Sequence, residues 1–195
     1  MNISAIVMAS GLSKRMNKSK LHMEINNKKI FEFILETIKL CQCFNEVIVV
    51  ANDLEIIQKS ESLEFKTVKN EKSYLGQSTS INLGLINSKY SQGYMFFVAD
   101  QPFINESTIK ALIDEFNKNP DKIVIPCYNG KSGNPVIFPH NLKEELLNLE
   151  GDIGGRAVIN NHINKVIKVH IQTDYENIDI DTMEDYEKVL KMKVI

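Results

Sequence analysis

A cluster of cations follows a short apolar segment near the N-terminus, and it is the first set of residues that could carry chemistry. Ala9, Ser10 and Gly11 are small enough to let backbone N–H groups approach an anion closely. Four cations then fall within seven positions: Lys14, Arg15, Lys18 and Lys20. This composition predicts a triphosphate site, although the spacing is neither that of a Walker A loop nor G-x-G-x-x-G. A solvated basic turn is the alternative, and the position directly after a predicted strand favours the phosphate site.

Carboxylates follow two later apolar segments. Asp100 comes directly after a long apolar run, and Asp179 and Asp181 alternate so that both face one side of an extended segment. A carboxylate at the end of a buried strand needs a partner, and Mg²⁺ binds one or two carboxylates together with phosphate oxygens. We therefore expect a magnesium site made by Asp100 with Asp179 or Asp181. The alternatives are a turn before a proline for Asp100 and capping of the next helix by Asp181 or Thr182.

A polar strip, residues 76–82, leads into a predicted helix. Gln77, Ser78 and Ser80 could hold a base, a ribose or a phosphate together with the free N–H groups of the helix. An ordinary helix cap by Ser78 or Thr79 explains these residues equally well. Gln77 and Ser80 are less easily explained by capping, so they are the stronger candidates.

Two glycine-bearing loops carry further candidates for substrate binding. Asn134 lies in the first loop, shortly before a predicted strand. Arg156 lies in the second loop, where it opens a predicted helix and could hold an anionic group of a substrate. Either loop could also be a plain turn.

These candidate residues need a scaffold that brings their segments together. Apolar segments of strand length alternate with amphipathic segments along the chain. The predicted strands are 4–8, 46–51, 64–68, 94–99, 122–126, 135–138 and 166–170, and the predicted helices are 29–40, 78–87, 106–116, 141–149, 154–160 and 183–192. This alternation predicts a three-layer, Rossmann-like α/β fold with a mostly parallel central sheet and helices on both faces. Ligands bind such sheets at the carboxyl ends of the strands, which directs attention to residues 9–11, 100–102 and 178–181.

The composition restricts both the class of protein and its location. With 195 residues, 43% of them hydrophobic and 25% charged, the chain suits one compact domain over residues 1–195. Lys and Arg total 23 against 25 Asp and Glu, so a nucleic-acid binder is not expected. No apolar run approaches the roughly 20 residues of a membrane helix, and the N-terminus lacks a basic leader, so we expect a cytoplasmic protein. The odd count of three cysteines favours free thiols, and the four scattered histidines do not form a zinc pattern.

Taken in order, these segments resemble motifs of the nucleotidyltransferases that act on the molybdenum cofactor. The similarity is closest to the molybdenum cofactor cytidylyltransferases, which have the MobA-like NTP transferase fold. The matching segments are 8–21, 76–80, 100–102, 133–138, 151–156 and 179–185. They cover nearly the whole chain, and their shared order makes the resemblance more specific than any single motif. Departures from the family pattern are Ser10 in place of a small residue, Asn17 in place of a glycine, Asn134 in place of a histidine and Met183 in place of a proline.

The resemblance implies that CTP and molybdopterin-bound molybdenum react to give molybdopterin cytosine dinucleotide and pyrophosphate, for use by a molybdenum hydroxylase or its chaperone. It implies Mg²⁺ as the cofactor, bound by Asp100 with Asp179 or Asp181. The residues implied for catalysis are Lys20, Arg15 and Asp100, those for nucleotide binding are Ala9, Ser10, Gly11, Lys20, Gln77, Ser78, Ser80 and Asp100, and those for acceptor binding are Asn134 and Arg156. Ser10 stands where the family recognises the base, so the choice of CTP over GTP stays open.

Other functions share parts of this pattern. A cytidylyltransferase acting on another phosphate, such as an isoprenoid precursor, and a guanylyltransferase of the molybdenum pathway belong to the same class. A non-catalytic protein that holds a nucleotide or pterin for delivery belongs to another class. Lys20 and Asp100 argue against a carrier, because a carrier need not keep a carboxylate for a metal. Release of pyrophosphate separates the enzymes from the carrier.

Overall fold

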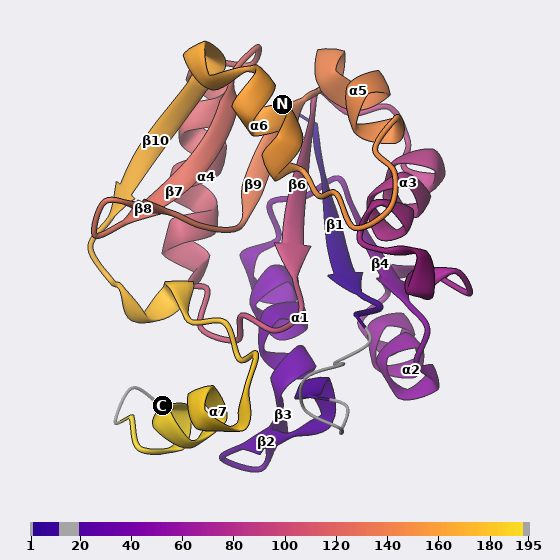
Figure 1. Cartoon of the computed structure of the whole chain (residues 1–195), viewed down its shortest axis with the longest axis vertical. Helices are drawn as coiled ribbons and strands as arrows, with labels where there is room; N and C mark the ends of the chain where they lie inside the picture. The colour runs from indigo at the N-terminus through magenta and orange to yellow at the C-terminus, as the bar shows by residue number, and fades with distance from the viewer. Residues whose placement is uncertain (1, 12–19, 193–195) are drawn as a thin grey trace.

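A mixed β-sheet forms the centre of the protein in the computed structural model, which describes residues 2–11 and 20–192 (Figure 1). The strands of this sheet are β1 (Ile3–Ala9), β4 (Glu46–Ala51), β5 (Lys66–Lys69), β6 (Gly93–Val98), β7 (Ile123–Tyr128), β8 (Lys131–Ser132), β9 (Val136–Pro139) and β10 (Val166–Ile171). Within the described residues their order is β10-β7-β9-β6-β1-β4-β5, with β8 beside β7. A separate antiparallel hairpin joins β2 (Glu24–Ile25) to β3 (Lys28–Lys29).

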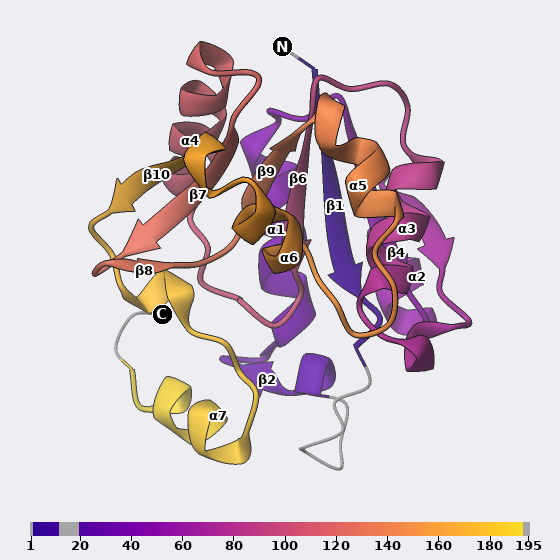
Figure 2. The ribbon, with the colours of Figure 1, turned by 45° about the horizontal axis from the view of Figure 1, so that its top comes forward.

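Helices cover both faces of the sheet (Figures 1 and 2). They are α1 (Ile30–Cys41), α2 (Leu54–Ser62), α3 (Ser78–Asn87), α4 (Glu106–Lys118), α5 (Lys143–Leu147), α6 (Arg156–Asn161) and α7 (Met183–Leu190). One hydrophobic cluster joins the sheet to α1, α2, α4 and α7, and the other joins it to α3, α5 and α6. Successive residues of β1 supply both, because Ala5 and Val7 face the first cluster and Ile6 faces the second. The expected three-layer α/β fold with a mostly parallel sheet is therefore confirmed.

The strand order reverses at β1, and this reversal positions the candidate site. β4 and β6 both pair with β1 in parallel, one on each side, and β5 extends the parallel part beyond β4. β9 runs antiparallel between β6 and β7. The carboxyl ends of β1 and β6 point toward the end of the molecule that carries α7 and the β2–β3 hairpin (Figure 1). A ligand crevice is expected at such a reversal, next to residues 9–11.

Helix α2, the β2–β3 hairpin and strand β8 are absent from the sequence prediction. Helix α2 was not predicted, because its amphipathic pattern is short, but Asp53 caps it strongly. The Asp53 Oδ1 atom accepts hydrogen bonds from the N–H groups of Glu55 and Ile56 at 3.0 and 3.2 Å. The β2–β3 hairpin was also missed. None of the described helices is long and apolar enough to cross a membrane.

The expectation of free cysteines is wrong for Cys41 and Cys43, which form a disulfide with their Cα atoms 5.4 Å apart. Cys41 is the last residue of α1, and the next residue, Gln42, has a left-handed backbone conformation with φ of 50°. This single residue turns the chain at the end of the helix and brings the two sulfur atoms together. Cys127 is a buried free thiol, as expected.

Candidate active site

Three segments that are distant in sequence meet at the carboxyl edge of the sheet and place one cation between two carboxylates. Lys20 Nζ donates to Asp100 Oδ2 at 2.5 Å and to Asp181 Oδ1 at 2.7 Å. Lys20 begins a short 3-10 turn, Asp100 follows β6, and Asp181 precedes α7. The side chain of Lys20 is only 12% exposed, so this contact is largely shielded from water. We call Lys20, Asp100 and Asp181 the ion cluster.

The two carboxylates keep the Lys20 ammonium group charged. Burial alone would lower the pKa of Lys20, because it removes the ammonium group from water. The charges and hydrogen bonds of Asp100 and Asp181 outweigh this effect and raise the pKa of Lys20 above its usual value. Lys20 is therefore a permanent positive charge at the edge of the sheet.

A backbone contact and a helix cap hold the two carboxylates in place. The N–H of Ile180 donates to the carbonyl of Asp100 at 3.2 Å, and Ile180 is fully buried. Thr182 Oγ1 accepts from the N–H of Asp185, while Asp185 Oδ2 accepts from the N–H of Thr182. Thr182 is therefore the residue that caps α7. The side chain of Asp181 contacts Lys20 within the ion cluster.

The ion cluster also fits a divalent cation. Asp100 Oδ1 is buried, and none of the described residues forms a hydrogen bond with it. Two carboxylates supply hard oxygen ligands of the kind that Mg²⁺ uses together with phosphate oxygens. Among residues 2–11 and 20–192, no group of three or more His, Cys, Asp or Glu side chains could hold a metal by itself. A cation at this place would therefore need oxygens from a substrate as well.

A small cavity of about 240 Å³ adjoins the ion cluster. Its lining includes Ser10, Gly11, Gln77 and Ser80 together with Lys20 and Asp100. Ser10 and Gly11 follow the carboxyl end of β1, and Ser80 lies in the first turn of α3. The Oγ atoms of Ser10 and Ser80 are 2.7 Å apart, and both residues are buried. The cavity thus combines small polar groups with the charges of the ion cluster, a lining that suits a nucleotide.

Asn70 organises these hydroxyl groups, although the sequence did not single it out. Its side chain is fully buried. Its Nδ2 atom lies 3.1 Å from both Ser10 Oγ and Ser80 Oγ and 3.0 Å from Thr79 Oγ1, and it donates to them. Asn70 directly follows β5, so it is a polar residue at a strand end, as Asp100 is. That shared position is the sequence pattern that could have identified it.

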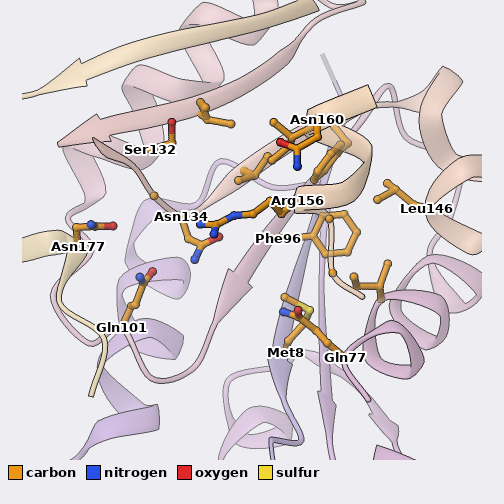
Figure 3. A pocket seen from close by; sticks show the side chains of 18 of the residues that line it. Met8, Gln77, Phe96, Gln101, Ser132, Asn134, Leu146, Arg156, Asn160 and Asn177 are labelled. Atoms are coloured by element: carbon orange, nitrogen blue, oxygen red, sulfur yellow. The ribbon is translucent and has the colours of Figure 1, made fainter. Parts of the chain in front are cut away.

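A larger cavity of about 890 Å³ lies beside the small one (Figure 3). Asn134, which lies shortly before β9, and Arg156, the first residue of α6, both line it, and Figure 3 shows their side chains pointing toward one another. Other carboxamide side chains in the lining are Gln77, Gln101, Asn160 and Asn177. Phe96 and Phe138 contribute to an apolar part of the wall. The cavity therefore offers an apolar surface, carboxamides and charged side chains of both signs, among them the Arg156 guanidinium group.

Gln101 and Asp179 form a hydrogen-bonded pair in the larger cavity. Gln101 is only 2% exposed, and its Nε2 atom donates to Asp179 Oδ1 at 2.8 Å. Burial raises the pKa of Asp179 to about 6, and the charge of nearby Asp100 adds to this effect. Gln101 Oε1 is buried without a hydrogen-bond partner among the described residues, so a ligand could supply the missing donor. Asp179 and Asp181 thus contact different groups, although they are only two positions apart.

The two cavities share part of their lining. The residues that line both are Met8, Gln77 and Asp152. At the start of the shared wall, Gly76 has a φ of +114°, and a Cβ atom there would lie 2.3 Å from the carbonyl of Gly151. Only glycine fits both this backbone conformation and this close approach. The loop that contains Gly151 therefore packs directly on the segment before α3, between the two cavities.

Several residues predicted to bind the nucleotide lie elsewhere or cannot be placed. Ser78 Oγ donates to the carbonyl of Gly151 at 2.8 Å, so Ser78 links the start of α3 to the loop that contains Gly151. Ala9 is buried in the hydrophobic cluster that includes α1. Neither Ser78 nor Ala9 belongs to the described lining of the two cavities. Arg15, together with the rest of segment 12–19, lies outside the residues that the structure describes.

The fold and the site together define a class of enzyme. A crevice at the reversal point of a mostly parallel sheet holds a permanent ammonium charge and two carboxylates. A second and larger cavity adjoins the first through a shared wall. This arrangement suits the transfer of a charged group from a nucleotide to a second substrate, because such transfer depends on positioning and charge neutralisation. The fold and the site therefore have the features expected of an α/β nucleotidyltransferase.

Within this class, the chain belongs to the MobA-like NTP transferase domain family, whose profile matches residues 5–166. The matched range begins in β1 and ends at the start of β10, so it contains most of the sheet. This match confirms the resemblance that the motifs indicate at the level of the MobA-like family. It does not distinguish cytidylyl from guanylyl transfer.

Two relatives show how far the sequence similarity extends. A probable molybdenum cofactor guanylyltransferase of Natranaerobius thermophilus is 33% identical over 131 residues, which are 66% of this chain and 62% of that protein. The chain thus matches less than two thirds of the length of that relative. The purine catabolism protein PucB of Bacillus subtilis is 25% identical over 198 residues, which cover 94% of each chain.

Solved structures share the fold at lower identity. The crystal structure of Rv0371c from Mycobacterium tuberculosis H37Rv has a TM-score of 0.85 and 20% sequence identity, with 98% of each chain covered. A nucleotidyl transferase from Methanothermobacter thermautotrophicus has a TM-score of 0.79 and 18% identity, with 96% of this chain and 95% of that chain covered. These likenesses confirm the α/β architecture.

Proposed function

We propose that this protein transfers CMP from CTP to the terminal phosphate of molybdopterin-bound molybdenum, giving molybdopterin cytosine dinucleotide and pyrophosphate. The observation that carries the proposal is the ion cluster in a small cavity that adjoins a larger one. Membership of the MobA-like family supports nucleotidyl transfer. The names of several relatives, probable molybdenum cofactor guanylyltransferases, support molybdopterin as the acceptor. The product would then pass to a molybdenum hydroxylase or to its chaperone.

The small cavity would hold the nucleotide. The residues proposed to bind the base and ribose are Ser10, Gly11, Gln77 and Ser80, and those proposed to bind the phosphates are Lys20 and Arg15. Asp100 and Asp181 would hold Mg²⁺, which neutralises charge on phosphate oxygens when it is bound. Asp181 is preferred over Asp179 because Asp179 is hydrogen-bonded to a buried glutamine in the other cavity.

The larger cavity would hold the acceptor. The apolar side chains of Phe96 and Phe138 suit the face of a fused heterocycle, and the neighbouring carboxamides suit its polar edge. The Arg156 guanidinium group, with Asn134 opposite it, would bind an anionic group of the acceptor (Figure 3). A pterin that carries a phosphate has both features.

The reaction needs positioning and charge neutralisation more than proton transfer. An oxygen of the acceptor phosphate forms a bond to the α-phosphorus of the nucleotide. The bond from the α-phosphorus to the oxygen that bridges to the β-phosphate breaks, and pyrophosphate leaves with that electron pair. A phosphate monoester is largely ionised near neutral pH, so no general base is needed. Lys20 supplies positive charge where negative charge accumulates on the α-phosphate and on pyrophosphate.

The choice of base depends on the hydroxyl pair of Ser10 and Ser80. A serine at position 10 carries an Oγ atom that a glycine or alanine lacks, and this atom lies 2.7 Å from Ser80 Oγ. A pyrimidine needs less room beside this pair than a purine does, which supports CTP. The relatives named as guanylyltransferases support GTP as the second candidate.

The test is a pyrophosphate-release assay with Mg²⁺, molybdopterin and either CTP or GTP. We expect release with CTP, loss of activity in Asp100→Asn, and normal activity in Asp114→Asn, which changes an exposed aspartate of α4. Preference for GTP would identify a guanylyltransferase. Release that requires a different phosphorylated acceptor would contradict molybdopterin as the substrate. Tight binding of nucleotide without pyrophosphate release from any acceptor would identify a delivery protein instead.

A further inference from the structure

The position of Lys20 has a consequence for how a cation reaches the site. Its ammonium nitrogen lies 2.5 Å from Asp100 Oδ2 and 2.7 Å from Asp181 Oδ1. A Mg²⁺ ion that bound the same two oxygens, at about 2.1 Å from each, would have to lie between them. The ammonium group and the cation cannot occupy this space together. A divalent cation can therefore bridge these two oxygens only after Lys20 has moved.

Charge also opposes binding of both cations at once. The two carboxylates carry two negative charges, and Lys20 already neutralises one of them. Adding a divalent cation beside Lys20 would bring like charges close together in a site where the Lys20 side chain is only 12% exposed. The carboxylates attract a divalent cation strongly only when the ammonium group has another partner.

A bound nucleotide would supply that partner. Lys20 lines the small cavity as well as contacting the carboxylates, so phosphates placed there lie within reach of its flexible side chain. A triphosphate brings several negative charges, which can attract the ammonium group and contribute oxygen ligands to a metal. The same movement of Lys20 then pairs its ammonium group with the phosphates and leaves the carboxylate oxygens able to bind a metal.

We propose that Lys20 is a placeholder cation, which occupies the divalent-cation site until a nucleotide draws it onto its phosphates. Nucleotide and divalent cation then bind cooperatively, and binding of the cation alone is weak. This inference rests on the proposed function, because it takes the small cavity as the nucleotide site. It gives Lys20 two successive partners, the carboxylates before nucleotide binding and the phosphates after it.

The test measures binding of Mn²⁺ alone, by electron paramagnetic resonance of the free ion, without nucleotide. We expect Lys20→Met to bind Mn²⁺ about tenfold more tightly than wild type or better, within the usual range of coupling between two sites. The double variant Lys20→Met/Asp100→Asn should lose this gain. Lys110→Met, which changes a lysine on the exposed side of α4, serves as the matched control and should bind as wild type does.

Equal Mn²⁺ affinity in wild type and Lys20→Met would overturn the inference, as would a gain that persists in the double variant. If Lys20→Met does not fold, Lys20→Gln removes the charge while keeping a polar side chain, and the same comparison applies. The rise in melting temperature on adding Mn²⁺ is a second readout, and it should be larger in either variant than in wild type.

A coupling measurement tests the role of the nucleotide. In wild type, CTP should bind much more tightly with Mn²⁺ than in EDTA, and this ratio should be smaller in Lys20→Met. An unchanged ratio would mean that nucleotide binding does not move Lys20. These outcomes are separate from the proposed function, since cation exchange without pyrophosphate release would refute only the transfer reaction. Pyrophosphate release with equal Mn²⁺ affinities would refute only the placeholder role.

Discussion

The two adjoining cavities are built in different ways. The small cavity is organised by full charges, with an ammonium group held between two carboxylates from distant segments. The lining of the larger cavity combines carboxamides and aromatic rings with separate charged side chains, and one buried carbonyl oxygen, Gln101 Oε1, has no partner among the described residues. A cation held between two carboxylates suits stabilisation of phosphates during transfer, and the carboxamides and rings of the larger cavity suit recognition of a shape. Substitutions in the two cavities should therefore affect different kinetic constants.

The largest effect is expected from Asp100→Asn in the small cavity. Removing this charge should lower the turnover rate about 100-fold or more, as loss of a positioned electrostatic group does in other enzymes. The fold should survive, because asparagine has nearly the same shape. The rate of pyrophosphate release measures the first point, and circular dichroism with urea denaturation measures the second. A near-normal rate in this variant would remove Asp100 from the reacting centre.

A smaller effect, and on another constant, is expected from Arg156→Met in the larger cavity. Loss of a charge-assisted contact should raise the KM for the acceptor about tenfold. The KM for the nucleotide should change little, because Arg156 does not line the small cavity. Arg156→Lys is the control that keeps the charge, and its KM for the acceptor should lie between those of wild type and Arg156→Met. Equal increases in the KM for the acceptor and the KM for the nucleotide would contradict the assignment of a different substrate to each cavity.

A glycine-to-alanine substitution should destabilise the protein more at Gly76, in the wall shared by the two cavities, than at Gly130, in a turn outside it. Gly76→Ala forces a side chain into a backbone conformation with φ of +114° and against the carbonyl of Gly151, so we expect a loss of stability of about 1–3 kcal/mol. Gly130, in the turn between β7 and β8, also has positive φ, but a Cβ atom added there would have no atom of the described residues within 4 Å. Gly130→Ala should therefore cost only about 1 kcal/mol. Urea denaturation of both variants measures the difference, and equal costs would show that the contact with Gly151 is not tight.

The smallest expected effect distinguishes the Asp179 carboxyl of the larger cavity from the carboxylates of the small one, which are paired with Lys20. The pKa of Asp179 is raised to about 6, so the folded protein holds this proton more tightly than the unfolded chain does. Stability from this group is therefore present at low pH and is lost as the pH rises through about 4 to 6. Because Asp179 is partly exposed and solvent screens its interactions, the effect is smaller than the full pKa shift implies, and Asp179→Asn should remove a loss of about 1–2 kcal/mol between pH 4 and pH 7 in metal-free protein. Urea denaturation in EDTA at pH 4 and pH 7 measures this loss of stability. The same pH dependence of stability in the variant and in wild type would contradict the prediction.

Strand ends allowed much of the site to be located from the sequence. Asp100 follows β6, and parallel strands bring their carboxyl ends to one edge of a sheet. The expectation of a strand end at residues 178–181 is wrong, because Asp181 lies between a 3-10 turn and α7, and Lys20 begins a 3-10 turn of its own. The role of Asn70 was harder to predict, because its importance comes from contacts with hydroxyl groups on two other segments. The different partners of Asp179 and Asp181 also depend on tertiary packing, because their alternating positions predict the same facing for both.

The fold was predicted more completely than its details. Buried strands and amphipathic helices have clear periodic patterns, whereas α2 depends on a single capping residue, Asp53. The disulfide between Cys41 and Cys43 depends on the left-handed conformation of one residue, Gln42, which has no periodic signature. Local backbone geometry of this kind is set after the elements have packed, so it is the part that pattern analysis misses.

The hydroxyl pair beside Asn70 has a consequence that follows from counting hydrogen atoms. Ser10 and Ser80 carry one hydroxyl hydrogen each, and their oxygens are 2.7 Å apart, so one hydrogen is used between them. The Asn70 amide has two hydrogens, which the two serine oxygens share with Thr79 Oγ1, and it uses none of the serine hydrogens, so one hydroxyl hydrogen of the pair remains. That remaining hydrogen can point at an acceptor atom of a base, such as a ring carbonyl. With an alanine at position 10 the Ser80 hydrogen would itself be unused, so the number of spare hydrogens stays at one; Ser10 instead adds a second oxygen from which that hydrogen can be presented to the nucleotide.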